Sequence, residues 1–167
     1  MKNGQNLRIG CIGGAMTELE RHLQMQIADY IRLQYPDVLF HSDFGSGIKL
    51  TPGQSRIQYR QNGGRRGWPD MFIAAPRVRH TTDGEFGIKL GWAQTDDGAD
   101  YYAMMFAGLF LEIKRDGTRL KKKNGEWSTT HIKEQANVLH RLRKRGYSAE
   151  FAVGFDEAKK IIDEYLR

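Results

Sequence analysis

The segment GLFLEIK, residues 108–114, restricts the possible fold more than any other part of this sequence. An apolar run of this length is typical of a strand in the centre of a sheet. Successive side chains of a strand point to opposite faces, so Glu112 and Lys114 share one face, while Leu111 and Ile113 share the other. The pattern therefore predicts a sheet whose central strand carries a glutamate beside a lysine.

A second carboxylate stands at the start of another apolar strand. In GWPDMFIA, residues 67–74, Pro69 fixes the backbone that enters the strand, and Asp70 follows it. If the two strands are neighbours, Asp70 and Glu112 converge. Two carboxylates and a main-chain carbonyl offer the oxygen ligands that suit Mg²⁺ or Mn²⁺, and such a site leaves waters free for chemistry.

Lys114 would complete this site for the hydrolysis of a phosphodiester bond. A lysine beside a metal can hold an attacking water or stabilise the charge that develops on a phosphate. The simpler alternative is structural. Glu112 and Lys114 would then neutralise each other as a salt bridge on a half-exposed strand, and Asp70 would only mark the strand entry. The residues alone leave both interpretations open.

The remaining segments predict an α/β fold in which helices flank a central mixed sheet. Residues 1–16 are expected to form a flexible arm, and residues 17–167 a single domain. Within it, an insertion at about 76–107 is expected to form a hairpin or an irregular excursion, and an Asn-Gly turn predicts a small basic hairpin within 121–127. The main expected elements are a helix over 17–34 that Thr17 caps, a strand over 38–44, a helix over 51–64 with Thr51 at its N-cap, strands over 71–75 and 108–114, a helix to Arg145 that Thr129 or Thr130 starts, a strand over 149–155 and a last helix that Asp156 caps.

The chain is basic, with 26 Lys and Arg against 20 Asp and Glu and a formal net charge of +6. This excess favours a polyanionic partner. Basic residues form runs before Asp70, after Glu112 and around Arg143, which favours the backbone of a nucleic acid over an ordinary solvated face. The candidate contacts to nucleic acid are Arg56, Arg60, Arg65, Arg66, Arg115, Arg119, Lys121, Lys122 and Lys123.

Several other kinds of site and protein are disfavoured. No segment approaches the roughly 20 apolar residues of a membrane helix, and the start of the chain lacks the apolar region of a secretory signal. Cys11 is the single cysteine, which excludes an internal disulfide and favours a reducing location, and no base stands beside it to activate it. GCIGG lacks the features of a phosphate loop. Trp127, beside three lysines, is the tryptophan to test as a base-stacking platform. The histidines, none of which has zinc spacing, are His22, His41, His80, His131 and His140, and His41 is the one that could line a cleft.

The order PD and then EIK resembles the PD-(D/E)XK nuclease superfamily. More of the chain resembles one branch of it, the VRR-Nuc (virus-type replication-repair nuclease) family in its small standalone form. The segments that carry the resemblance are GWPDMFIA, GLFLEIKRDG and KEQANVLHRLRKRGYSAEFAVGFDEAKKIIDEYL, and the similarity covers roughly residues 17–167. The spacer between Asp70 and Glu112 is longer than in small relatives, and we interpret the excess as the insertion.

The resemblance implies a role for each matching residue. Asp70 and Glu112 would bind Mg²⁺ or Mn²⁺ together with the main-chain carbonyl of Ile113. Lys114 would be the catalytic lysine, and Gln135, in the helix that follows, would lie near the site. An ordinary exposed glutamine is the simpler interpretation of Gln135.

The resemblance also implies a restriction-endonuclease-like core and a glutamate from the first helix, for which Glu20 is the first choice and Glu18 the alternative. A solvated glutamate in the first turn is the simpler interpretation of either. The implied protein is a metal-dependent DNA endonuclease that selects branched DNA such as four-way junctions. It would act as a homodimer in the cytoplasm, that of a bacterial host if the chain comes from a phage. Two alternatives stay open: a DNA-binding module without catalysis, and a sequence-specific nuclease of the restriction type.

Overall fold

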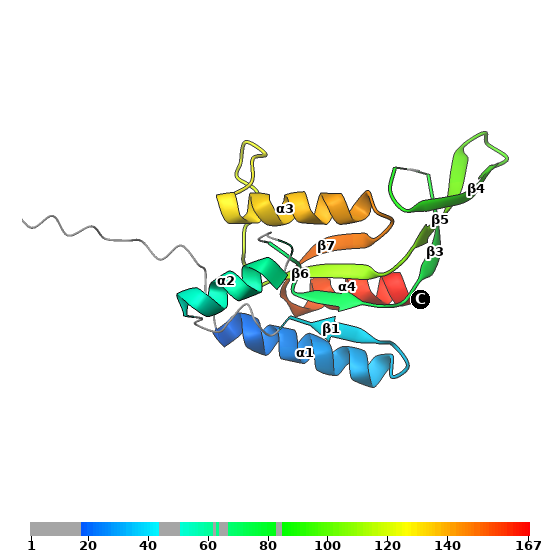
Figure 1. Cartoon of the computed structure of the whole chain (residues 1–167). Coiled ribbons are helices and arrows are strands. Elements are labelled where there is room, and N and C mark those ends of the chain that lie inside the picture. Colours follow the sequence, from blue (N-terminus) through cyan, green and yellow to red (C-terminus); the bar gives the residue numbers. More distant parts are fainter. Residues whose placement is uncertain (1–17, 44–50, 62, 64–66, 83–84) are drawn as a thin grey trace, which may run out of the picture.

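The computed structural model describes residues 18–43, 51–61, 63, 67–82 and 85–167 (Figure 1). The predictions for the N-terminal arm, Thr17, Cys11, Arg65 and Arg66 lie outside these residues. The elements, in chain order, are α1 (Glu18–Gln34), β1 (Phe40–Ser42), α2 (Pro52–Gln61), β2 (Met71–Ile73), β3 (Arg77–Thr81), β4 (Ile88–Gln94), β5 (Asp100–Phe106), β6 (Leu109–Lys114), α3 (Thr130–Arg143), β7 (Ser148–Val153) and α4 (Gly154–Leu166).

The main sheet has the strand order β1-β2-β6-β7, so β6 lies inside the sheet as predicted. It runs antiparallel to β2 and parallel to β7, which makes the sheet mixed. Met71 of β2 lies opposite Leu111 of β6. Because an antiparallel neighbour runs the other way, Asp70, just before β2, comes level with Glu112, just after Leu111. The register alone therefore brings the two carboxylates together.

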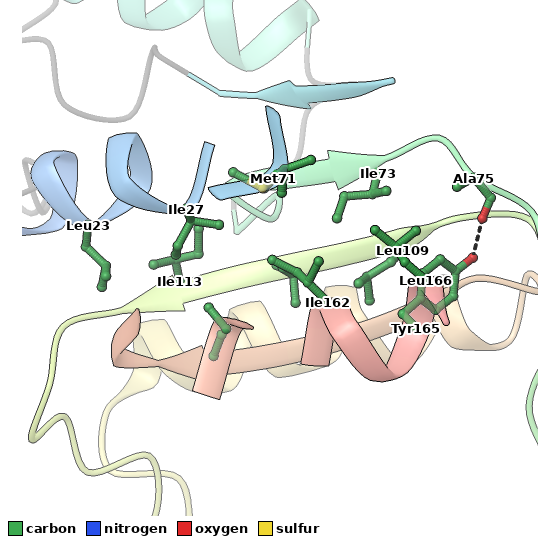
Figure 2. Packing of buried hydrophobic residues seen from close by; sticks show 14 residues of the cluster. Leu23, Ile27, Met71, Ile73, Ala75, Leu109, Ile113, Ile162, Tyr165 and Leu166 are labelled. Atoms are coloured by element: carbon green, nitrogen blue, oxygen red, sulfur yellow. Dashed lines mark hydrogen bonds between the residues drawn. The ribbon is translucent and has the colours of Figure 1, made fainter. Parts of the chain in front are cut away.

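Helices cover both faces of this sheet, which confirms the predicted mixed α/β architecture (Figure 1). On one face, α1 and α4 bury a continuous apolar core against the odd-numbered residues of β6, as Figure 2 shows for Ile27, Ile113 and Ile162. On the other face, α3 packs Leu139 and Leu142 over Ala149. Full burial of one such leucine or isoleucine contributes about 1.5–3 kcal/mol. No helix in the described ranges is long and apolar enough to cross a membrane.

The insertion at 76–107 forms a second, antiparallel sheet with the order β3-β5-β4. The expected hairpin is therefore present as β4 and β5, and β3 adds a third strand to it. This sheet projects from the end of the molecule at which α3 ends, opposite the end at which α1 and α3 begin (Figure 1). Tyr165 of α4 anchors its base, since its hydroxyl donates a hydrogen bond to the carbonyl of Ala75 at 2.7 Å (Figure 2).

Local capping chemistry explains where most of the helices begin. The Thr129 hydroxyl accepts a hydrogen bond from the Ile132 amide at 3.1 Å, as predicted. The Thr51 hydroxyl accepts a hydrogen bond from the Gln54 amide at 3.3 Å, and the side-chain oxygen of Gln54 accepts one from the backbone amide of Thr51. The prediction that Asp156 caps α4 was wrong. Val153 occupies the N-cap, and the carboxylate of Glu157 accepts from the Val153 amide at 2.7 Å.

Several element ends also differ from the sequence-based expectation. The first strand covers only residues 40–42 and the strand that follows Asp70 only 71–73, because a strand lasts only as long as its neighbour pairs with it. The last strand stops at Val153, where α4 begins, and α3 ends at Arg143 instead of Arg145.

A buried aspartate ties the end of α4 to α1 and predicts a defined loss of stability in acid. Asp163 is 8% exposed and accepts hydrogen bonds from the hydroxyls of Tyr30 and Tyr35 and from the ammonium of Lys159. Burial raises the pKa of this carboxyl, but these hydrogen bonds and the charge of Arg167 outweigh burial and lower the pKa from 3.8 to about 2.

We expect Asp163→Asn to reduce the free energy of unfolding by about 1–3 kcal/mol near neutral pH, because the hydrogen bonds to a charged acceptor are weakened. The folded pKa is depressed, so this contribution is fully present above the unfolded value of 3.8 and is lost as the pH falls through about 2. Urea unfolding of both proteins between these limits should show the difference shrinking. Asp29→Asn, at an exposed site, is the control. A difference that stays constant down to the lowest pH would contradict the assignment.

Candidate active site

Asp70 and Glu112 meet at the end of the main sheet where β6 ends. Both are buried, with 9% of Asp70 and 1% of Glu112 exposed. Asp70 Oδ2 accepts a hydrogen bond from the backbone amide of Ile113 at 2.8 Å, so the strand entry after Pro69 is tied directly to β6. The predicted convergence of the two carboxylates is present in the structure.

Two side chains hold Glu112 in place. The ammonium of Lys114 donates to Glu112 Oε1 at 2.7 Å, and the amide of Gln135 donates to the same oxygen. The Lys114 side chain is only 12% exposed, so this is a nearly buried pair and not the half-exposed salt bridge of the simpler interpretation. Gln135 is also buried, which contradicts its interpretation as an ordinary exposed glutamine.

Burial raises the pKa of both carboxylates. Burial raises the pKa of Asp70, while the Ile113 amide and the charge of Lys114 oppose the rise. Burial also raises the pKa of Glu112 well above its ordinary value, the charge of Asp70 adds to that rise, and Lys114 opposes it. Two negative groups that one ammonium incompletely balances form a site that favours additional positive charge.

Two buried oxygens at this site have no hydrogen-bond partner among the described residues. They are Oε2 of Glu112 and Oε1 of Gln135. An oxygen that is buried without a donor costs free energy, and a hard cation satisfies such oxygens directly. The donor set of Asp70, Glu112 and nearby carbonyl oxygens therefore fits Mg²⁺ or Mn²⁺. Among the described residues, no three acidic, imidazole or thiol side chains gather closely enough to hold a metal by themselves, so main-chain or amide oxygens and water would complete the coordination.

The first glycine of the GWPD segment allows α3 to approach the site closely. Gly67 has a φ of +77°, a conformation that side chains other than glycine rarely adopt. A Cβ at this position would lie 3.2 Å from the backbone nitrogen of Gln135 and 3.3 Å from its Cγ. Gly67 was not a candidate in the sequence, although a glycine two residues before the PD pair is the signal that could have indicated it.

Replacing Gly67 with alanine should therefore disturb the site and not only the backbone. We expect the strain to lower the free energy of unfolding by about 1–2 kcal/mol, and the displacement of Gln135 to lower catalytic activity about tenfold or more. Gly98→Ala is the matched control, since Gly98 has a similar φ of +83° with nothing within 4 Å of its Cβ position. Equal losses of activity in both variants would show that Gly67 matters only for stability.

The first turns of α1 and α3 contribute further groups near this site. Glu20 is close enough for its charge to raise the pKa of Asp70, although it is not part of a metal-binding group with the two carboxylates. The side chain of Glu18 lies outside the described residues. His131 was not among the candidate site residues of the sequence. Burial and the charge of Lys114 lower the pKa of His131, and Glu134 and Glu20 oppose this. Its position one helical turn before Gln135 is the signal that could have identified it.

The basic candidates are exposed where the structure describes them. Arg56 and Arg60 lie on α2, a helix that buries none of its residues. The others follow β6 directly and lead into α3. Within that turn, the ammonium of Lys121 lies 5.1 Å above the ring of Trp127, which also packs against Phe151 and so anchors the turn. The exposed residues of this second run are Arg115, Arg119, Lys121, Lys122 and Lys123.

Not every basic or histidine residue lies where the sequence suggested. Arg143 does not extend the exposed run at the end of α3, because its guanidinium is held by Glu150 at 2.8 Å. His41 is exposed on β1, opposite Phe72 of β2.

Known proteins resemble this chain in structure and not in sequence motifs that define a family. No family model matches the sequence, and no curated protein matches it. Among solved structures, one described as "VRR_NUC domain protein" aligns with 90% of this chain and 90% of its own, at 20% sequence identity and a TM-score of 0.49. The contacts of the site itself therefore carry the functional assignment.

Proposed function

We propose that this protein is a metal-dependent DNA endonuclease that hydrolyses phosphodiester bonds. The observation that carries the proposal is the buried pair of Asp70 and Glu112, with Lys114 on one oxygen of Glu112 and no partner on the other. A fold gains no stability from two buried carboxylates whose pKa values are raised by burial. Their burial in contact with a lysine is accounted for if they bind a cation for catalysis.

The residues of the site would divide the work as follows. Asp70, Glu112 and the carbonyl of Ile113 would hold Mg²⁺ or Mn²⁺, which when bound supplies Lewis-acid stabilisation of a phosphate oxygen and lowers the pKa of a bound water. Gln135 keeps Glu112 in position through its amide. The ammonium of Lys114 would face the phosphate, where it stabilises the additional negative charge of the transition state. Water adds to phosphorus, and the bond from phosphorus to one ester oxygen breaks, which leaves a phosphate monoester and a hydroxyl.

The proposed substrate is DNA because exposed basic side chains lie on α2 and on the segment that directly follows β6. Arg56 and Arg60 are four residues apart on α2, which carries no acidic residue. Such residues contact phosphates and position the duplex without reading its sequence. Selection would then follow the shape of the DNA, and the resemblance to the VRR-Nuc family suggests branched DNA. It also suggests a homodimer, in which a two-fold axis presents two sites to two strands.

A panel of labelled substrates tests this function. Four-way junction, splayed-arm, flap and linear duplex DNA would be incubated with Mg²⁺ or Mn²⁺, beside lanes with EDTA and with Asp70→Ala. We expect metal-dependent cutting of the junction that both controls abolish. Tight, salt-sensitive binding without cutting under either metal would instead indicate a DNA-binding module. Discrete bands at fixed sequences on plasmid DNA would indicate a nuclease of the restriction type. Sedimentation of the protein used in the assay would report whether it is a dimer.

A further inference from the structure

A cavity of about 450 Å³ lies at the other end of the main sheet from Asp70 and Glu112. It is found where the inserted sheet meets the end of α3 and the start of β7 (Figure 1). Ser148, which lines the cavity, pairs with Leu109. Because Leu109 precedes Glu112 by three residues on β6, the cavity and the carboxylates are separated by about 10 Å along the strands. The cavity is therefore a separate feature of the molecule.

The walls of this cavity combine flat rings with hydrogen-bond donors. Phe86, Phe106 and Tyr147 supply the aromatic surface, and Arg79 of β3, on the same face of the inserted sheet as Phe106, supplies donors. Its volume lies within the range of about 300–1,000 Å³ that is usual for small-molecule sites. Aromatic surface beside arginine is the combination that binds nucleotides, because the base stacks on a ring while the guanidinium contacts a phosphate.

The charges that line the cavity leave it positive. Glu150 is the single carboxylate among its lining residues, and Arg143 holds that carboxylate at 2.8 Å. Burial raises the pKa of Glu150, and the charges of Arg143 and Arg79 oppose the rise, so both guanidinium groups lie close to it. With Arg143 and Glu150 balancing each other, Arg79 remains as the charge that an anionic ligand would meet.

We propose that this cavity binds one unpaired nucleotide, with its phosphate on Arg79 and its base against the aromatic rings. Two of the three rings and the guanidinium of Arg79 come from residues 76–107, so the insertion would build a site for an unpaired nucleotide beside a nuclease core. The nucleotide has two possible sources, an unpaired strand of the DNA substrate or a free nucleotide. The first source rests on the proposed nuclease function, whereas the second does not.

The test measures binding without cleavage. Fluorescence anisotropy in EDTA, with Asp70→Asn as the parent protein, would compare a duplex that carries a short single-stranded overhang with a blunt duplex of the same sequence. We expect Arg79→Gln to weaken binding of the overhang duplex about tenfold, the size of a lost stacking and phosphate contact, and to leave blunt duplex binding unchanged. An overhang without bases should bind as weakly to the parent as the normal overhang binds to Arg79→Gln. Arg32→Gln, an exposed arginine on α1 that pairs with Asp29, is the matched control.

Calorimetric titration with dAMP distinguishes the two sources. Binding of dAMP to the parent protein but not to Arg79→Gln, without any effect of the overhang, would assign the cavity to free nucleotides. Equal weakening of blunt and overhang duplexes would overturn the proposal, since Arg79 would then be an ordinary phosphate contact. The proposal would also be overturned if Arg79→Gln bound every ligand as tightly as the parent protein does. Because no cleavage is measured, these outcomes do not depend on whether the protein cuts DNA.

Discussion

Lys114→Ala should lower the rate of metal-dependent DNA cleavage by about a hundredfold to a thousandfold, the usual cost of removing one group that stabilises charge in a transition state. The ammonium of Lys114 is held at 2.7 Å from Glu112 and is nearly buried, so no neighbouring lysine of the exposed run can take its place. The measurement is the single-turnover cleavage rate at saturating metal, because that rate separates the chemical step from DNA binding.

The control for this variant is Lys160→Ala. Lys160 lies on α4 in an exposed pair with Glu164, away from the two carboxylates. It should cleave at the rate of the wild type. Binding of uncleaved DNA should change little in Lys114→Ala, since its expected role is in the transition state. Full cleavage by Lys114→Ala would return Glu112 and Lys114 to the role of a structural ion pair.

The second large effect is on metal-dependent stability. A ligand that binds only the folded protein adds about 2.7 kcal/mol at a hundredfold excess over its Kd, which corresponds to about 5–10 °C in melting temperature for a chain of this size. We expect Mn²⁺ or Mg²⁺ to produce such a rise in the wild type and little or none in Asp70→Asn. Differential scanning calorimetry after dialysis against EDTA, with and without added metal, would measure it.

Asp70→Asn should also melt no lower than the wild type when metal is absent. The amide oxygen can still accept from the backbone of Ile113, and one of two buried like charges is gone. In active sites, a substitution that stabilises the fold commonly removes function. Asp37→Asn, an exposed position between α1 and β1, should retain the metal-dependent rise. An undiminished rise in Asp70→Asn would locate the cation elsewhere and remove the main support for a metal-dependent nuclease.

The charged residues of the candidate site could be predicted from the sequence more readily than the residues that surround and position them. Asp70, Glu112 and Lys114 were identified because a charged residue within or beside an apolar strand is unusual and therefore informative. Gly67 and His131 were missed, since a glycine and an isolated histidine carry no periodicity. Gly67 is approached by α3 and His131 lies on α3, so only the packing of this helix shows that both are near the site.

The sequence by itself determined the character of each segment of this protein. Apolar periodicity defined the helices and the central strand, and the order of PD and EIK identified the two carboxylates and the lysine, because these signals are local. Only the tertiary structure decided which of these segments and side chains contact one another. The antiparallel register that sets Met71 opposite Leu111 brings Asp70 to Glu112, which lies 42 positions later in the sequence, and the packing of α3 buries Gln135 on the same oxygen as Lys114. Strand pairing, burial and the cavity beside β3 arise from contacts between distant segments. The free energies of these contacts therefore cannot be predicted from the sequence of any one segment.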